Sequence, residues 1–158
     1  MAIRQGFMVD ASVPFDAGMD FAAAHGFDFV ELNMEHPFFR DLDADRVRAA
    51  TSDRGLDVVA HLPYRLDVGS PHEHVRDGAC RQLEAAVDTA VACEAETGVF
   101  HATTTVSPAD WGAETLREWI YDSVRRVDSH AREAGLVAAV ENVKQSYFDA
   151  GDFPDLFA

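Results

Sequence analysis

The stretch HLPYRLDVGSP at residues 61–71 follows a short apolar run at residues 56–60. The apolar run predicts a buried strand, because it is only five residues long and turn residues bound it. The strand ends on His61, and the loop that follows contains two prolines and a glycine. Since α/β proteins place their chemistry at the carboxyl ends of parallel strands, His61 is the first candidate functional residue.

Two later apolar runs end in the same way, one on His101 and the other on Glu141. The whole chain alternates predicted strands with predicted helices. We expect strands at residues 3–9, 27–32, 56–61, 98–101 and 136–141. We expect helices at 15–25, 43–54, 72–96 and 114–134, a loop at 103–111, a second loop at 142–151, and the first turns of another helix at 153–158. This alternation indicates repeated βα units around a parallel sheet.

Two arrangements of these units fit. The first is a partial (β/α)8 TIM barrel, in which residues 1–158 form a single domain with about five of the eight βα units. A complete barrel needs roughly 250 residues, so this reading implies a domain that is truncated after strand five. The alternative is an open parallel α/β sheet of the doubly wound kind. The sequence contains no glycine-rich phosphate-binding motif that would support a nucleotide-binding role.

The composition is strongly acidic, with a formal net charge of −15. This charge argues against a nucleic-acid partner that is held by broad electrostatic attraction. Lys144 is the single lysine, and an acidic surface with little lysine is similar to those of halophilic microbes. No window approaches the roughly 18 apolar residues of a membrane span, and the first ten residues do not form a secretory signal, so we expect a cytoplasmic protein without a membrane partner. Cys80 and Cys93 are expected to be buried, reduced thiols.

The residues at the strand ends resemble those of the xylose isomerase-like TIM barrel superfamily, which includes AP endonuclease family 2 and the sugar phosphate isomerases/epimerases. The resemblance is carried by HLPY at 61–64, GSP at 69–71, FH at 100–101 and VEN at 140–142. Two positions depart from the family pattern. Asp67 stands where asparagine is usual, and Ala102-Thr103 stands where many members have Pro-Gly.

The resemblance implies a divalent metal, with zinc or manganese expected, at the carboxyl face of the barrel. In endonuclease IV-like members, strands three and four supply histidine ligands and strand five supplies a bridging glutamate. These roles carry over to His61, His101 and Glu141. The ligands that strands six to eight supply in the family have no counterpart in this sequence. The active centre formed by this chain alone is therefore expected to be incomplete, and whether the chain is active alone stays open.

Three functions stay open. The first is a sugar or sugar phosphate isomerase/epimerase-like enzyme, in which Glu141 is both a metal ligand and the acid/base. The second is an endonuclease IV-type AP endonuclease that binds DNA, where Tyr64 occupies the position of an aromatic residue near the DNA. The third is a non-catalytic truncated barrel that self-associates as a homo-oligomer through open sheet edges.

Four further residues are candidates for substrate binding: Tyr64, Glu31, Asn142 and Trp111. Aromatic rings stack on sugars or bases, and carboxylate and amide groups accept or donate hydrogen bonds to hydroxyls. Each candidate also has a purely structural interpretation, because loop aromatics often only pack and Glu31 is as well suited to a salt bridge. Glu35 and His36 are weaker candidates for residues that approach the mouth of the barrel.

Overall fold

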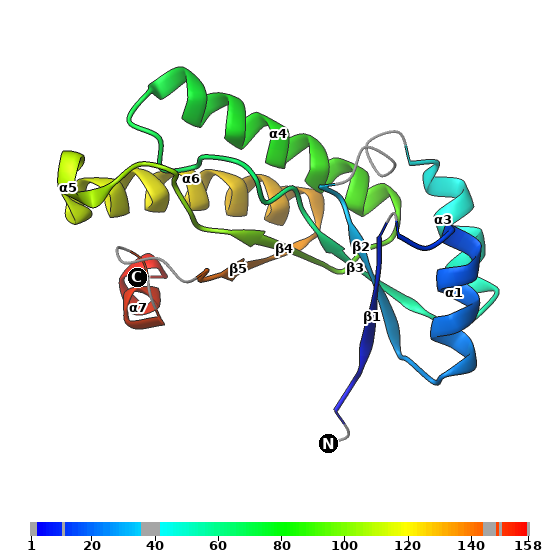
Figure 1. Ribbon diagram of the computed structural model, residues 1–158. Coiled ribbons are helices and arrows are strands. Elements are labelled where there is room, and N and C mark those ends of the chain that lie inside the picture. The colour runs from blue at the N-terminus through cyan, green and yellow to red at the C-terminus, as the bar shows by residue number, and fades with distance from the viewer. Residues whose placement is uncertain (1–2, 11, 36–41, 144–147, 149, 158) are drawn as a thin grey trace.

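The computed structural model describes residues 3–10, 12–35, 42–143, 148 and 150–157 (Figure 1). Five parallel strands form one sheet in the order β1-β2-β3-β4-β5. The strands are β1 (Gly6–Val9), β2 (Phe29–Asn33), β3 (Asp57–His61), β4 (Thr97–His101) and β5 (Val137–Glu141). All five predicted strands are therefore present.

The helices alternate with the strands along the chain. They are α1 (Phe15–Ala24), α3 (Ala44–Ser52), α4 (Glu73–Ala92), α5 (Pro108–Trp111), α6 (Ala113–Ala134) and α7 (Phe153–Leu156), with a 3-10 turn at Ala150–Asp152 before α7. Because each strand pairs with the next one in sequence, the chain winds in one direction without reversing. A doubly wound sheet reverses its strand order, so this topology is that of a partial TIM barrel whose sheet is open.

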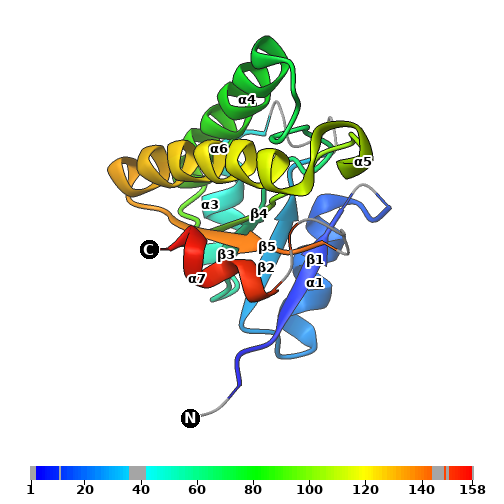
Figure 2. The ribbon, with the colours of Figure 1, turned by 90° about the vertical axis from the view of Figure 1, so that its left-hand side faces the viewer.

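The four long helices α1, α3, α4 and α6 cover one face of the twisted sheet (Figures 1 and 2). On that face Val30, Val58 and Phe100 are at most 4% exposed, whereas Phe7, Ala138 and Val140 on the outer strands are partly buried. The opposite face corresponds to the interior of a barrel, and there Met8 is 42% and Val137 64% exposed. The hydrophobic core therefore lies between the sheet and the helices, and the face that would line a barrel is accessible.

Local sequence signals set the ends of several elements. Oδ1 of Asp43 accepts hydrogen bonds from the backbone N–H groups of Asp45 and Arg46, so Asp43 is the N-cap of α3 as expected. Gly135 ends α6 with φ at +88°, in the left-handed region that a side chain disfavours.

Several predicted boundaries were wrong. The helix predicted over residues 72–96 ends at Ala92, and the strand predicted from residue 27 begins at Phe29. The predicted loop 103–111 contains α5, because Ser107 caps this short helix at Ala109 N and Pro108 occupies its first position. The predicted loop 142–151 includes the start of the 3-10 turn at Ala150. The first strand begins at Gly6 rather than at Ile3, and the Ile3 side chain is 87% exposed, so its hydrophobicity does not report burial.

Both cysteines are free and buried, as predicted. None of the helices in the described part of the chain has the length and apolar character needed to cross a bilayer.

Candidate metal centre

His61, His101 and Glu141 converge at the carboxyl ends of β3, β4 and β5. One potential ligand atom from each side chain lies within 4.8 Å of the others. His101 and Glu141 are direct partners in the β4–β5 register, whereas His61 pairs with Val99, two residues before His101. Since side chains on a strand alternate between faces, this register directs all three groups to the accessible face of the sheet.

The His61 imidazole is buried and held by its own loop. Its Nδ1 lies 3.1 Å from the carbonyl oxygen of Leu62. Because a carbonyl oxygen can only accept a hydrogen bond, this contact requires the tautomer with the proton on Nδ1. The lone pair of Nε2 is then available to a ligand, which is the arrangement found for histidines that bind metals.

The His101 imidazole lies next to the Glu141 carboxylate, with Nε2 3.3 Å from Oε2. Burial and the nearby His61 lower the pKa of His101, and Glu141 opposes this by favouring the charged imidazolium. The net effect is a lowered pKa, so His101 is neutral at neutral pH. A neutral imidazole is the form that coordinates a cation.

Glu31 on β2 faces the same group. Its carboxyl is half-buried, and this desolvation raises its pKa, while His61 lowers it and Glu141 raises it further. Glu31 pairs with Val59, two residues before His61, so the strand register puts Glu31 on the same face of the sheet as the three candidate ligands. Its predicted role in substrate binding remains a prediction.

Tyr64 lies against both imidazoles. Its ring centroid is 5.0 Å from that of His61 in an edge-on arrangement and 5.2 Å from that of His101. The two imidazole centroids are themselves 5.1 Å apart. The three rings form one cluster, and the predicted role of Tyr64 in substrate binding stays a prediction.

The other predicted binding residues lie differently. Trp111 is on α5, where its ring packs edge-on against Trp119 of α6 at 5.9 Å, so this ring contact is structural. Asn142 directly follows Glu141 and is exposed. His36 lies outside the described residues. Substrate binding by Trp111 and Asn142 stays a prediction.

The loop from His61 to Pro71 is held in place by its neighbours. Thr105 donates a hydrogen bond to Oδ2 of Asp67 at 2.7 Å, which ties this loop to the one after β4. Ser123 on α6 donates to the carbonyl of Val68 at 2.7 Å, and Arg76 on α4 donates to the carbonyl of Ser70. These bonds hold the later part of the loop, from Asp67 to Ser70, against α4, α6 and the loop after β4.

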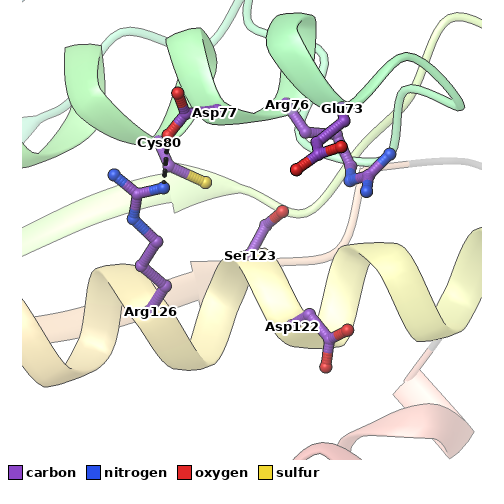
Figure 3. A pocket seen from close by; sticks show the side chains of 7 residues that line it. All are labelled: Glu73, Arg76, Asp77, Cys80, Asp122, Ser123 and Arg126. Carbon is purple, nitrogen blue, oxygen red and sulfur yellow. Dashed lines mark hydrogen bonds and ion pairs between the residues drawn. The ribbon is translucent and has the colours of Figure 1, made fainter.

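Ser123 and Arg76 also line a hollow between α4 and α6 (Figure 3). Within it, Arg126 on α6 pairs with Asp77 on α4 at 2.7 Å. Arg126 also pairs with Glu84, further along α4, at 2.6 Å. The charges in this hollow therefore join two helices, on the side of the sheet opposite to the three candidate ligands.

The donor set suits a divalent cation. Two imidazole nitrogens and one carboxylate are ligands that zinc and manganese accept. Two ligands that are each about 2.1 Å from a tetrahedral ion lie roughly 3.4 Å apart, close to the 3.3 Å between His101 and Glu141. Three protein ligands also leave a coordination position for a substrate oxygen or water.

The sequence and the fold both have counterparts among known families and solved structures. Residues 19–157 match the family model described as xylose isomerase-like TIM barrel. No curated protein sequence matches the chain significantly.

Solved structures with the same fold include sugar epimerases and an endonuclease. A D-tagatose 3-epimerase-like protein superposes with a TM-score of 0.79 at 18% identity, and the match covers 98% of this chain and 58% of that one. Endonuclease IV from Thermus thermophilus has a TM-score of 0.70 at 20% identity, with coverage of 99% and 59%. Another Thermus thermophilus protein, soaked with ZnCl2, has a TM-score of 0.63 at 26% identity, with coverage of 90% and 56%. The chain spans less than two thirds of each of these structures.

Proposed function

Because the chain belongs to the xylose isomerase-like TIM barrel family, we propose that it carries part of a divalent-metal centre that acts on a sugar or sugar phosphate. The observation that carries the proposal is the convergence of His61, His101 and Glu141 at one end of the sheet. We further propose that residues 1–158 form a single domain. The sugar epimerases among the structural neighbours support this class of substrate.

The chemistry that these residues support is proton transfer next to a carbonyl, as in isomerisation or epimerisation. A bound divalent ion supplies Lewis-acid polarisation of a carbonyl oxygen. The Glu141 carboxylate is 52% exposed and faces the accessible side of the sheet, so it is able to accept a proton from an adjacent C–H group. His61 and His101 hold the cation through their imidazole nitrogens, while Tyr64 and Glu31 contact the substrate.

A second candidate function is hydrolysis of phosphodiesters at abasic sites. Histidine ligands from strands three and four, followed by an aromatic residue such as Tyr64, are the endonuclease IV-like pattern, and endonuclease IV is among the structural neighbours. The net charge of −15 opposes this candidate, since a polyanion such as DNA is repelled by an acidic protein at moderate salt. A neutral sugar carries no such penalty, and the single phosphate of a sugar phosphate is repelled less than a polyanion is.

One experiment separates these functions. The chain is incubated with Zn²⁺ or Mn²⁺ and offered either a panel of ketoses and ketose phosphates or an abasic-site DNA duplex. Because this chain carries only part of the centre, we expect slow turnover of a sugar. Glu141→Gln abolishes this turnover, and Glu133→Ala, at an exposed position near the end of α6, leaves it intact. DNA cleavage without sugar turnover would favour the nuclease. Absence of both activities, together with absence of bound metal, would favour the non-catalytic barrel.

We also propose that the exposed edges of β1 and β5 pair with another chain. In the described part of the sheet these two strands are the outermost ones, and unpaired strand edges favour association. The mass in solution, measured by light scattering at several concentrations, tests this: a monomer at all concentrations contradicts it.

A further inference from the structure

We propose that Glu35 is a positioning residue, which holds Tyr64 against the imidazoles of His61 and His101. The functional consequence of this inference rests on the proposed metal centre, but the positioning itself does not. Glu35 lies in the segment after β2 and is half-buried.

The Glu35 carboxylate binds the backbone at Tyr64. Its Oε2 accepts a hydrogen bond from Tyr64 N at 2.9 Å and another from Arg65 N at 3.2 Å. Hydrogen bonds from N–H groups to a carboxylate are stronger than those between neutral groups. Two such bonds to successive residues fix the direction of the backbone at the point where the Tyr64 side chain leaves it.

The backbone that carries this side chain is anchored to the sheet. The backbone N–H of Glu35 donates to Oδ1 of Asn33, the last residue of β2, at 3.2 Å. The backbone N–H of Met34 donates to the carbonyl of His61 at 2.9 Å. The segment after β2 is therefore bonded to the segment after β3 twice. The backbone of Met34 bonds the carbonyl of His61, and the Glu35 side chain bonds the backbone of Tyr64 and Arg65.

The Tyr64 ring has three close neighbours. It contacts the rings of His61 and His101, and the guanidinium carbon of Arg65 lies 5.9 Å from the Tyr64 ring centroid. Since Glu35 holds the N–H groups of both Tyr64 and Arg65, loss of its carboxylate releases both groups together. The imidazoles then lose the ring that limits their rotation, and the ligand nitrogens become less well ordered.

The test compares Glu35→Ala with Glu35→Gln, because glutamine keeps one acceptor oxygen, as many as the two hydrogen bonds use, and replaces the other oxygen and the charge with an NH2 group. The first measurement is made without metal: the ring C–H resonances of His61 and His101 are recorded by NMR, since they sense the ring current of Tyr64. We expect Glu35→Ala to move both resonances toward their positions in Tyr64→Ala, and Glu35→Gln to leave them within a small fraction of that shift. Glu133→Ala serves as the control for loss of a carboxylate elsewhere.

The second measurement is a titration with Co²⁺, followed by its absorption spectrum. We expect Glu35→Ala to weaken Co²⁺ binding roughly tenfold, which is the lower end of the effect of losing a supporting residue around a metal site. We expect Glu35→Gln to bind Co²⁺ within a few-fold of the wild type. If the resonances of His61 and His101 stay in place in a folded Glu35→Ala variant, Glu35 does not position Tyr64. If the wild-type chain binds no Co²⁺, the proposed metal centre fails, while the resonance shifts still decide the role of Glu35.

Discussion

His101 and Glu141 are opposite each other in the parallel β4–β5 pair, and Nε2 of the imidazole lies 3.3 Å from Oε2 of the carboxylate. Their proximity follows from register alone, because partners in a parallel pair on the same face have side chains that point the same way. His61 lies on the neighbouring strand β3, where its partner in β4 is Val99, two residues before His101. The register of the strands therefore brings the three side chains together.

Removal of both histidines is expected to abolish metal binding. In a His61→Ala/His101→Ala variant only the Glu141 carboxylate of the three donors is left, and one exposed carboxylate does not retain zinc or manganese through gel filtration. We expect the metal content, measured by elemental analysis, to fall at least tenfold, since even loss of residues behind the ligands weakens such sites roughly 10- to 100-fold. The matched control is His72→Ala/His74→Ala, which removes two exposed histidines at the start of α4. Equal metal content in both variants would remove the site.

Cys93 is expected to make stability fall at high pH. Burial raises the pKa of its thiol to about 11, although the nearby Arg48 opposes the shift. The unfolded chain, with an ordinary thiol, loses this proton at lower pH than the folded chain does. The free energy of unfolding contributed by Cys93 is therefore complete below about pH 9 and decreases as the pH rises through about 11.

The measurement for Cys93 is urea unfolding at pH 7, 9 and 10.5, on the wild type and on Cys93→Ala. Other groups titrate in this range, so the informative quantity is the difference between the two proteins. We expect Cys93→Ala to be less stable by roughly 1 kcal/mol at pH 7, as for many buried substitutions. That difference narrows above pH 9. A difference that stays constant up to pH 10.5 would contradict the burial effect.

Glu94 is expected to be a site where glycine increases stability. Its φ of 62° is in the left-handed region, which costs a residue with a side chain about 1–2 kcal/mol. Glu94→Gly removes this strain and loses a distant ion pair with Arg48, whose atoms are 4.0 Å apart. Part of the gain is offset by the greater freedom of glycine in the unfolded chain, so we expect a net gain of up to about 1 kcal/mol in chemical denaturation.

Gly135→Ala is the opposite substitution, from glycine to a residue with a side chain at a left-handed position. A Cβ at this position has no atom within 4 Å, so the expected loss of about 1 kcal/mol comes from the φ of +88° rather than from a clash. A stabilised Gly135→Ala would show that the backbone relaxes on substitution. A destabilised Glu94→Gly would show that the strain at Glu94 is smaller than the cost of the lost ion pair and of the freedom of glycine in the unfolded chain.

Asp43 is expected to stabilise α3 through its cap. Asp43→Ala removes the acceptor for two backbone N–H groups, and thermal unfolding should report a loss of about 1 kcal/mol, within the usual range of roughly 0.5–2 kcal/mol. Asp53 lies at the other end of the same helix, where a negative charge opposes the helix dipole. Asp53→Ala is therefore the control, and it should be neutral or slightly stabilising. Equal losses in both variants would mean that the cap is not the cause.

The sequence alone was sufficient to predict the alternation of strands and helices and the residues at the strand ends. Both depend on local signals, such as the apolar run before His61 and the glycine that ends α6 at residue 135. The grouping of His61, His101 and Glu141 was also predicted, through the family resemblance and the rule that parallel strands end at the same side of a sheet. Short local structure was predicted less well, as the missed helix α5 shows, because a single turn leaves almost no periodic pattern.

Tertiary structure decided what the individual side chains contact. The Glu35 carboxylate reaches backbone groups 29 and 30 residues away, and no spacing in the sequence indicates that partnership. The contact between Trp111 and Trp119 could not be predicted either. Whether a loop aromatic binds a ligand or packs on a neighbouring helix depends on distances across the fold. Periodicity and turn residues act over a few positions along the chain, whereas hydrogen bonds and ring contacts between loops depend on how the strands align in space.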